Sequence, residues 1–84
     1  MAGDKKHQQV CAEVVRLLHE ERERQGLSKY AVAERSGLSE QMVGYVERGL
    51  RNPSLETVVR LASALEVDLG DIIKKAYKSV SRAA

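Results

Sequence analysis

Aromatic residues and cysteine are scarce in this chain of 84 residues. It contains no Trp and no Phe, three Tyr and a single Cys. The core must therefore be aliphatic, and the lone Cys11 cannot form an intramolecular disulfide. Because Cys11 lies in an apolar helical stretch, we interpret it as a small buried hydrophobic residue rather than a redox or metal-binding group. A chain of this length suits one domain, so we expect no ligand-sensing domain and no small-molecule ligand.

An excess of charge of one sign is also missing. The chain has 14 basic and 12 acidic residues, and a net charge of +2 does not by itself indicate nucleic-acid binding. Long apolar runs of the kind found in membrane spans or signal peptides are absent too, which favours a cytoplasmic protein. His7 and His19 have no nucleophile or carboxylate partner at a recognisable spacing, and the acidic residues follow no metal-ligand pattern. The sequence therefore predicts a protein without enzymatic activity, metal or cofactor.

Helical periodicity and capping residues run through most of the chain. The first apolar repeat at helical spacing ends at Gly26. Three serines and Asp68 then precede four further helical stretches, where a side-chain oxygen can accept hydrogen bonds from the backbone of the first turn. No segment alternates in the manner of a strand. The sequence predicts an all-α bundle of five helices over residues 9–78, with a flexible polar arm over 1–8 and a tail over 79–84.

Two short helices with serine caps form the most informative stretch. The first is expected over about 28–35 and the second over about 39–48, and a turn of about four residues between them is typical of a helix-turn-helix. Gly37 permits the tight turn, while Val43 and Val46 would hold the second helix against the rest of the domain. The second helix is therefore predicted to be a recognition helix that enters the major groove of DNA.

The outer face of this recognition helix is polar. Gln41 can offer both hydrogen-bonding atoms of its amide to an adenine, and the first turn of such a helix is where base edges are reached. Side chains at helix starts and in flanking loops instead contact phosphates and fix the register. The predicted base-reading residues are Glu40, Gln41, Gly44 and Tyr45, and the predicted phosphate-binding residues are Ser28, Lys29, Ser39, Arg48, Arg51 and Asn52.

Five short motifs occur in order along residues 10–73. They are Arg22-x-x-x-Gly26-Leu27-Ser28, Val32-Ala33, Ser36-Gly37-Leu38-Ser39, Val46-Glu47-Arg48-Gly49 and Pro53-Ser54-Leu55-Glu56-Thr57. Together they resemble the lambda-repressor-like family of helix-turn-helix regulators, also called the Cro/repressor or xenobiotic-response-element type. The resemblance implies a five-helix fold that binds pseudo-palindromic operators as a dimer, and a structural ion pair between Arg22 and Glu47. It also implies base reading by Glu40, Gln41 and Tyr45.

Three residues in this region need separate interpretation. Lys29 follows the serine cap where the family often has Gln, a change that is compatible with phosphate binding. Glu40 could accept a hydrogen bond from a cytosine amine, interact with the helix dipole, or repel DNA. Gly44 lies in mid-helix at a cost of about 1 kcal/mol relative to Ala. Either the backbone approaches a base closely there, or the glycine is merely tolerated.

Two functions from different classes remain open. A small autonomous DNA-binding regulator, bacterial or phage-encoded and associated with the nucleoid, is favoured, either as a repressor or as a controller of a restriction-modification operon. The alternative is an antitoxin-type or adaptor protein whose main partner is another protein, since folds of this kind can serve either role. A homodimer is expected for the regulator, although the same residues could pack within the monomer. Its predicted interface consists of Leu69, Ile72, Ile73 and Tyr77.

Overall fold

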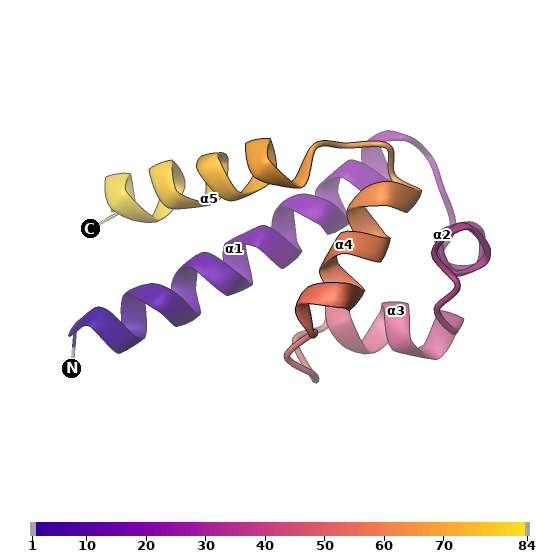
Figure 1. Ribbon diagram of the computed structural model, residues 1–84, viewed down its shortest axis with the longest axis horizontal. Coiled ribbons are helices and arrows are strands. Elements are labelled where there is room, and N and C mark those ends of the chain that lie inside the picture. The colour runs from indigo at the N-terminus through magenta and orange to yellow at the C-terminus, as the bar shows by residue number, and fades with distance from the viewer. Residues whose placement is uncertain (1, 84) are drawn as a thin grey trace.

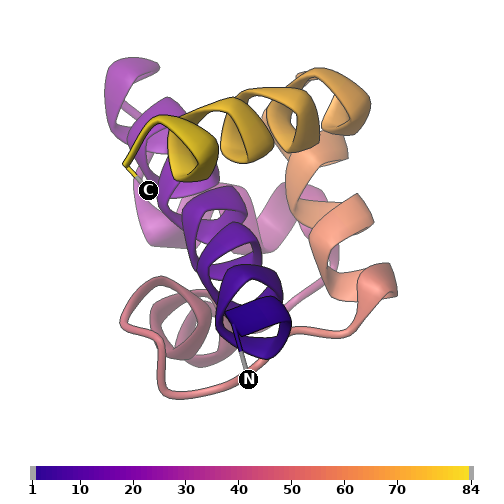
Figure 2. The ribbon, with the colours of Figure 1, turned by 90° about the vertical axis from the view of Figure 1, so that its left-hand side faces the viewer.

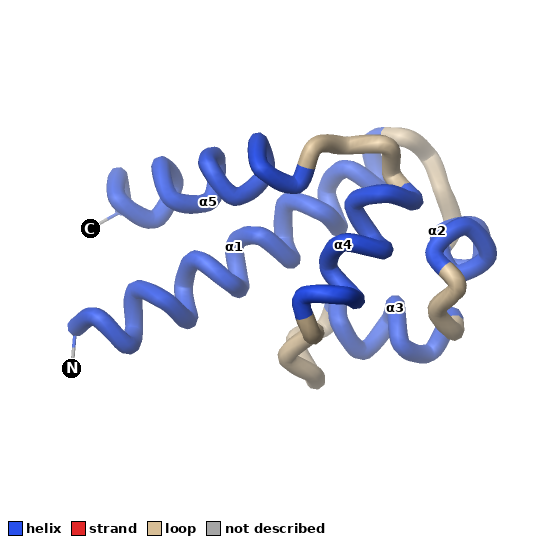
Figure 3. Tube along the Cα trace, in the orientation of Figure 1, coloured by secondary structure: helices blue, strands red, loops and turns tan. Residues whose placement is uncertain are grey.

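Serine caps begin the three helices in the middle of the chain. In the computed structural model, which describes residues 2–83, the hydroxyls of Ser28, Ser39 and Ser54 accept hydrogen bonds from backbone N–H groups three residues further on, at 3.0, 3.0 and 3.1 Å. Asp68 caps the last helix in the same way. The predicted all-α fold of five helices is confirmed, and the described residues contain no strand (Figure 1, Figure 3). The helices are α1 (Ala2–Arg24), α2 (Lys29–Ser36), α3 (Glu40–Glu47), α4 (Leu55–Ala64) and α5 (Leu69–Ala83).

The long helix α1 runs through most of the length of the molecule. α5 packs beside it in the opposite direction, so the start of α1 and the end of α5 lie at the same end of the molecule (Figure 1, Figure 2). α2, α3 and α4 gather around the other end of α1. α2 is seen end-on in Figure 1 while α3 lies across the view, which shows that these two helices cross steeply. This arrangement places α3 at the edge of the molecule, with one side turned inward and one outward.

The core is aliphatic, as the scarcity of aromatic residues required. All five helices contribute to it, and none of the three tyrosines is buried. Val43 and Val46 are each 1% exposed and hold the inner side of α3 against α1 and α2. Charged and polar side chains cover much of the outside. Within residues 2–83, no helix has both the length and the apolar character that crossing a membrane requires.

Both ends of the domain differ from the prediction. α1 begins at Ala2, so the segment predicted to be a flexible arm is helical from residue 2, and α5 continues beyond residue 78 to Ala83. Residues 5–9 have exposed side chains. Ala, Lys and Gln favour the helical conformation, so a helix rich in them can continue beyond its packed part without a repeat of apolar residues. At the other end, Val80 still packs against the core. The first and last residues of the predicted arm and tail, 1 and 84, lie outside the described residues.

Cys11 is exposed, so its interpretation as a buried residue was wrong. It follows the buried Val10 by one residue, which turns its side chain by about 100° around the helix axis and away from the core. The prediction relied on the apolar character of the neighbouring residues and not on the position of Cys11 around the helix.

Candidate nucleic-acid interface

A tight turn joins α2 to α3 and sets the angle between them. Gly37 ends α2 in the left-handed region with a φ of 76°, and its N–H donates to the carbonyl of Ala33. A side chain at this position would be strained, and its Cβ would lie 2.9 Å from Nη1 of Arg60. The buried hydroxyl of Ser36 donates to the same carbonyl at 3.3 Å and accepts from the N–H of Leu38 at 3.2 Å. Gly37 was predicted to permit the turn, but no role was predicted for Ser36, whose position directly before the glycine was the available signal.

Polar side chains cover the outer side of α3. Glu40 and Gln41 are exposed, and Tyr45 is half-buried. The side-chain amide of Gln41 donates to the hydroxyl of Tyr45 at 2.6 Å, because residues four positions apart lie on the same face of a helix. The structure therefore brings together two of the predicted base-reading residues on the outer side of α3.

Two arginines lie against the ring of Tyr45. The guanidinium carbon of Arg48, which follows α3, is 5.7 Å from the ring centroid, and that of Arg51, in the next loop, is 5.5 Å from it. Both distances lie within the range of a cation–π interaction. Nε of Arg48 also donates to the carbonyl of Gly44 at 3.3 Å. A predicted base-reading side chain is thus in contact with two predicted phosphate ligands.

Gly44 is buried, whereas the prediction placed it open on the outer face of α3. A Cβ at this position would lie 3.8 Å from Nη2 of Arg48 and 3.9 Å from Nζ of Lys29. The glycine therefore lies beneath two cationic side chains, one from each side of the helix-turn-helix. A base edge could reach its backbone only after these side chains had moved aside.

The remaining predicted phosphate ligands lie at the starts of α2 and α3 and in the loop after α3. The hydroxyls of Ser28 and Ser39 accept the capping hydrogen bonds and can still donate their own protons. Asn52 is exposed in the loop that follows α3. Glu40 is the acidic exception, and it forms no ion pair with any described residue. It lies in the first turn of α3, where the helix dipole favours a negative charge.

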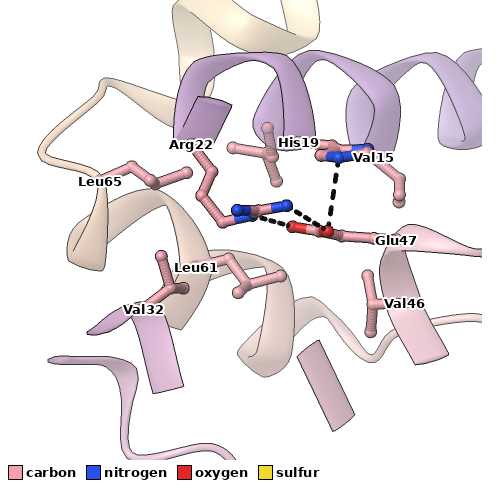
Figure 4. A pocket seen from close by; sticks show the side chains of 9 residues that line it. Val15, His19, Arg22, Val32, Val46, Glu47, Leu61 and Leu65 are labelled. Carbon is pink, nitrogen blue, oxygen red and sulfur yellow. Dashed lines mark hydrogen bonds and ion pairs between the residues drawn. The ribbon is translucent and has the colours of Figure 1, made fainter. Parts of the chain in front are cut away.

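A partly buried ion pair joins the C-terminal end of α3 to α1, as the family resemblance implied. Glu47 accepts two hydrogen bonds from the guanidinium of Arg22, from Nε at 2.7 Å and from Nη2 at 3.0 Å (Figure 4). Only 12% of the Arg22 side chain and 9% of the Glu47 side chain are exposed. The carboxylate raises the pKa of Arg22, whose Nη1 also donates to the carbonyl of Leu27 at 2.7 Å. The charge of Glu47 is therefore balanced inside the protein and does not add to that of Glu40.

The pocket beside this ion pair is small. Its volume is about 10 Å³, which is room for about one water molecule and not for an organic ligand. Apolar side chains from four helices close it, among them Val15, Leu61 and Leu65 (Figure 4). His19 completes the wall, with Nε2 at 3.5 Å from the Glu47 carboxylate.

A larger apolar groove lies between α1, α5 and the segment that leads into α4. Its volume is about 800 Å³, and its lining includes Leu55, Leu69, Ile73 and Tyr77. Of the four residues predicted to form a dimer interface, Tyr77 is 48% exposed, and Leu69 and Ile73 are partly buried. Ile72 is only 7% exposed, so its assignment to an interface was wrong, because its side chain belongs to the core of the monomer. Leu55, which is 73% exposed in the groove, was not predicted to belong to an interface.

These features define a protein that presents the second helix of a tight helix-turn-helix on its surface. A family model described as helix-turn-helix matches residues 18–72, which include α2, the turn and α3. The match covers more than half of the chain. The chain therefore belongs to this helix-turn-helix family of DNA-binding transcriptional regulators, which are not enzymes, and the predicted resemblance to the Cro/repressor type is confirmed.

Several known proteins share this sequence pattern. An uncharacterized HTH-type transcriptional regulator, y4dJ from Sinorhizobium fredii, is 40% identical over 52 residues, which are 62% of this chain and 68% of the relative. An uncharacterized HTH-type transcriptional regulator of Mycobacterium tuberculosis is 41% identical over 51 residues, which are 61% of this chain and 36% of the relative.

Two solved structures share the fold. The restriction-modification controller protein C.AhdI from Aeromonas hydrophila is 39% identical, with a TM-score of 0.68, over 74% of this chain and 94% of that chain. A point mutant of the restriction-modification controller protein C.Esp1396I has a TM-score of 0.80, over 89% of this chain and 97% of that chain. Its identity is 19%, so this second likeness concerns the fold alone.

Proposed function

We propose that this protein is a sequence-specific transcriptional regulator that binds double-stranded DNA as a homodimer on a pseudo-palindromic operator. It acts either as a small repressor or as a controller of a restriction-modification operon. The observation that carries the proposal is the polar outer face of α3, where Gln41 and Tyr45 lie beside three cationic side chains. The 39% identity with C.AhdI supports the controller type. Such a protein acts on the nucleoid in the bacterial cytoplasm.

In this function the first two turns of α3 enter the major groove. Glu40, Gln41 and Tyr45 face the base edges, where one bidentate contact contributes about 1–3 kcal/mol of discrimination between bases. Gly44 lies beneath this surface and lets Lys29 approach the helix closely. Phosphates on either side of the groove are held by Ser28, Lys29, Ser39, Arg48, Arg51 and Asn52.

The apolar groove between α1 and α5 is the proposed dimer interface. A core of this size contributes only about 3–5 kcal/mol, so burying the exposed parts of Leu55, Ile73 and Tyr77 against a second copy would add stability. A two-fold dimer would place its two α3 helices about 34 Å apart, one turn of DNA. Sedimentation at micromolar concentration that gives only the monomer mass would contradict this arrangement.

The same groove favours a second candidate function, a module of the antitoxin or adaptor type whose main partner is another protein. Leu55 and Tyr77, which line the groove, are large apolar residues with 73% and 48% of their surface exposed. Such a surface can receive a different chain as well as a second copy of this one. DNA selection distinguishes the regulator from an adaptor, because an adaptor requires no preferred DNA sequence.

Selection of bound sequences from a random pool of double-stranded DNA tests the proposed function. We expect enrichment of a pseudo-palindrome whose half-sites are centred about 10 base pairs apart, or a multiple of that distance. A folded protein that enriches no sequence would contradict the regulator and leave the protein-binding module.

Two variants then test the division into base-reading and phosphate-binding residues. Gln41→Ala should weaken binding to the selected site by about 1–3 kcal/mol and relax the choice of one base pair. Arg48→Ala should weaken selected and random sequences alike and flatten the dependence of log K on log salt by about 1 unit. Equal losses at all sequences for both variants would contradict the division.

A further inference from the structure

Tyr45 lies at the centre of the contacts on the outer face of α3. Its hydroxyl accepts the hydrogen bond from the Gln41 amide at 2.6 Å. Its ring lies 5.7 Å from the guanidinium carbon of Arg48 and 5.5 Å from that of Arg51. These three partners come from the first turn of α3, from its C-terminal end and from the loop that follows it. One side chain therefore connects parts of the surface that are otherwise separate.

The two kinds of contact leave the partners able to bind DNA. Gln41 uses one amide hydrogen on Tyr45 and keeps the other hydrogen and the carbonyl oxygen for a base edge. A guanidinium above an aromatic ring is attracted by the face of the ring, so the N–H groups of Arg51 remain available to phosphate oxygens. Restraining such long side chains before binding lowers the entropy that is lost when DNA immobilises them.

We propose that Tyr45 is a positioning residue that links base reading to phosphate anchoring. Its hydroxyl orients the amide of Gln41, and its ring orients the guanidinium groups of Arg48 and Arg51. This inference rests on the proposed DNA-binding function and deepens it, because it gives Tyr45 a role that acts through other residues. A tyrosine that only read a base would need neither the hydrogen bond from Gln41 nor a cation on its ring.

Two substitutions separate the hydroxyl from the ring. Tyr45→Phe removes the hydroxyl and keeps the ring, whereas Tyr45→Leu removes both. Tyr30→Phe removes the same hydroxyl from α2, at a 60% exposed position outside the proposed DNA and dimer contacts, and is the matched control. The free proteins are first compared by thermal unfolding, and all three variants should remain folded because both tyrosines lie outside the core.

Each variant is measured by titration with the selected operator, with an operator changed at the base pair read by Gln41, and with random DNA. For Tyr45→Phe, discrimination at that base pair should fall about 2- to 12-fold, the range of one hydrogen bond, while affinity for random DNA and the salt dependence stay unchanged. For Tyr45→Leu, affinity for all three DNAs should also fall, by about 2- to 5-fold for each arginine released. Tyr30→Phe should match the wild type.

A double-mutant cycle gives the result that would overturn the positioning role. In a Gln41→Ala background, Tyr45→Phe should have no further effect, since the amide that the hydroxyl orients is gone. Losses that simply add would mean that Tyr45 reads DNA independently. In the free protein, NMR relaxation should show a more mobile Gln41 amide in Tyr45→Phe than in the wild type. A wild type that selects no sequence overturns the proposed function as well, whereas an additive cycle on a selected operator overturns the positioning role alone.

Discussion

Replacing Glu47 by Gln would measure how strongly the ion pair between α1 and α3 holds the recognition helix in place. Gln has nearly the size of Glu but no charge, so the two charge-assisted hydrogen bonds from Arg22 at 2.7 and 3.0 Å are reduced to weaker ones. Removing one partner of a buried pair costs about 3–5 kcal/mol. Both side chains here keep about a tenth of their surface in water, and the new amide oxygen still accepts one hydrogen bond. We therefore expect a loss of about 2–3 kcal/mol in the free energy of unfolding.

Thermal and urea unfolding without DNA provide the assay. In a domain of this size, 1 kcal/mol corresponds to about 4–8 °C in Tm, so Glu47→Gln should melt about 8–24 °C below the wild type. Glu56→Gln is the matched control, since it makes the same change in an arginine pair whose partners are 73% and 46% exposed. It should cost about 0.5 kcal/mol or less, because exposed ion pairs contribute little.

A third variant identifies the cause of the loss. Arg22→Met combined with Glu47→Met removes both charges and leaves none uncompensated, so it should recover a large part of the stability that Glu47→Gln alone loses. The reasoning is refuted if Glu47→Gln is no more destabilising than Glu56→Gln. It is also refuted if the double variant is less stable than Glu47→Gln, because the unpaired charge of Arg22 would then not be the source of the loss.

Three further substitutions test other features of the fold. Gly44→Ala should raise Tm by about 4–8 °C, because Ala stabilises a helix by about 1 kcal/mol relative to Gly. The added methyl group would meet only the flexible ends of Lys29 and Arg48, at ordinary contact distance. A lower Tm would contradict this. Val43→Ala should lower the free energy of unfolding in urea by about 2–3 kcal/mol, since Val43 is 1% exposed. A loss below about 1 kcal/mol would show that the packing of Val43 does not hold α3 in place. Hydrogen bonds from Arg24 and then Gln25 lower the pKa of Glu21 from 4.5 to about 2, so its contribution to stability is present above pH 4.5 and is lost as the pH falls toward 2. Glu21→Gln should therefore lose less stability than the wild type between pH 4.5 and pH 2, and parallel curves of the urea midpoint against pH would refute this.

The helix boundaries in the middle of the chain could be read from single residues. Ser28, Ser39 and Ser54 each precede a helix in the structure, and Gly37 has the positive φ that its place in the turn requires. Capping hydrogen bonds join atoms three residues apart, so they depend only on local sequence. The outer ends of α1 and α5 carry no such signal, and their boundaries were misplaced.

The candidate site was predictable in composition but not in arrangement. The capping and turn residues follow from local sequence. Helical spacing places each residue on one face of a helix, and so it predicts the polar Glu40 and Gln41 and the apolar Val43 and Val46. The pair of Arg22 with Glu47 spans 25 residues and was implied only by the resemblance to a family. No local rule joins residues at such a separation.

The tertiary structure decided what each side chain touches. Lys29 reaches Gly44 only because α2 and α3 cross at the angle that the turn sets, and Gly44, predicted to be open, is buried. Arg51 reaches the ring of Tyr45 only because the loop after α3 folds back. Sequence by itself determined the helices, their caps and the polar side of the recognition helix, because these depend on neighbouring residues and on helical periodicity. Burial and contact between elements depend on packing in three dimensions, which no single segment of the chain specifies.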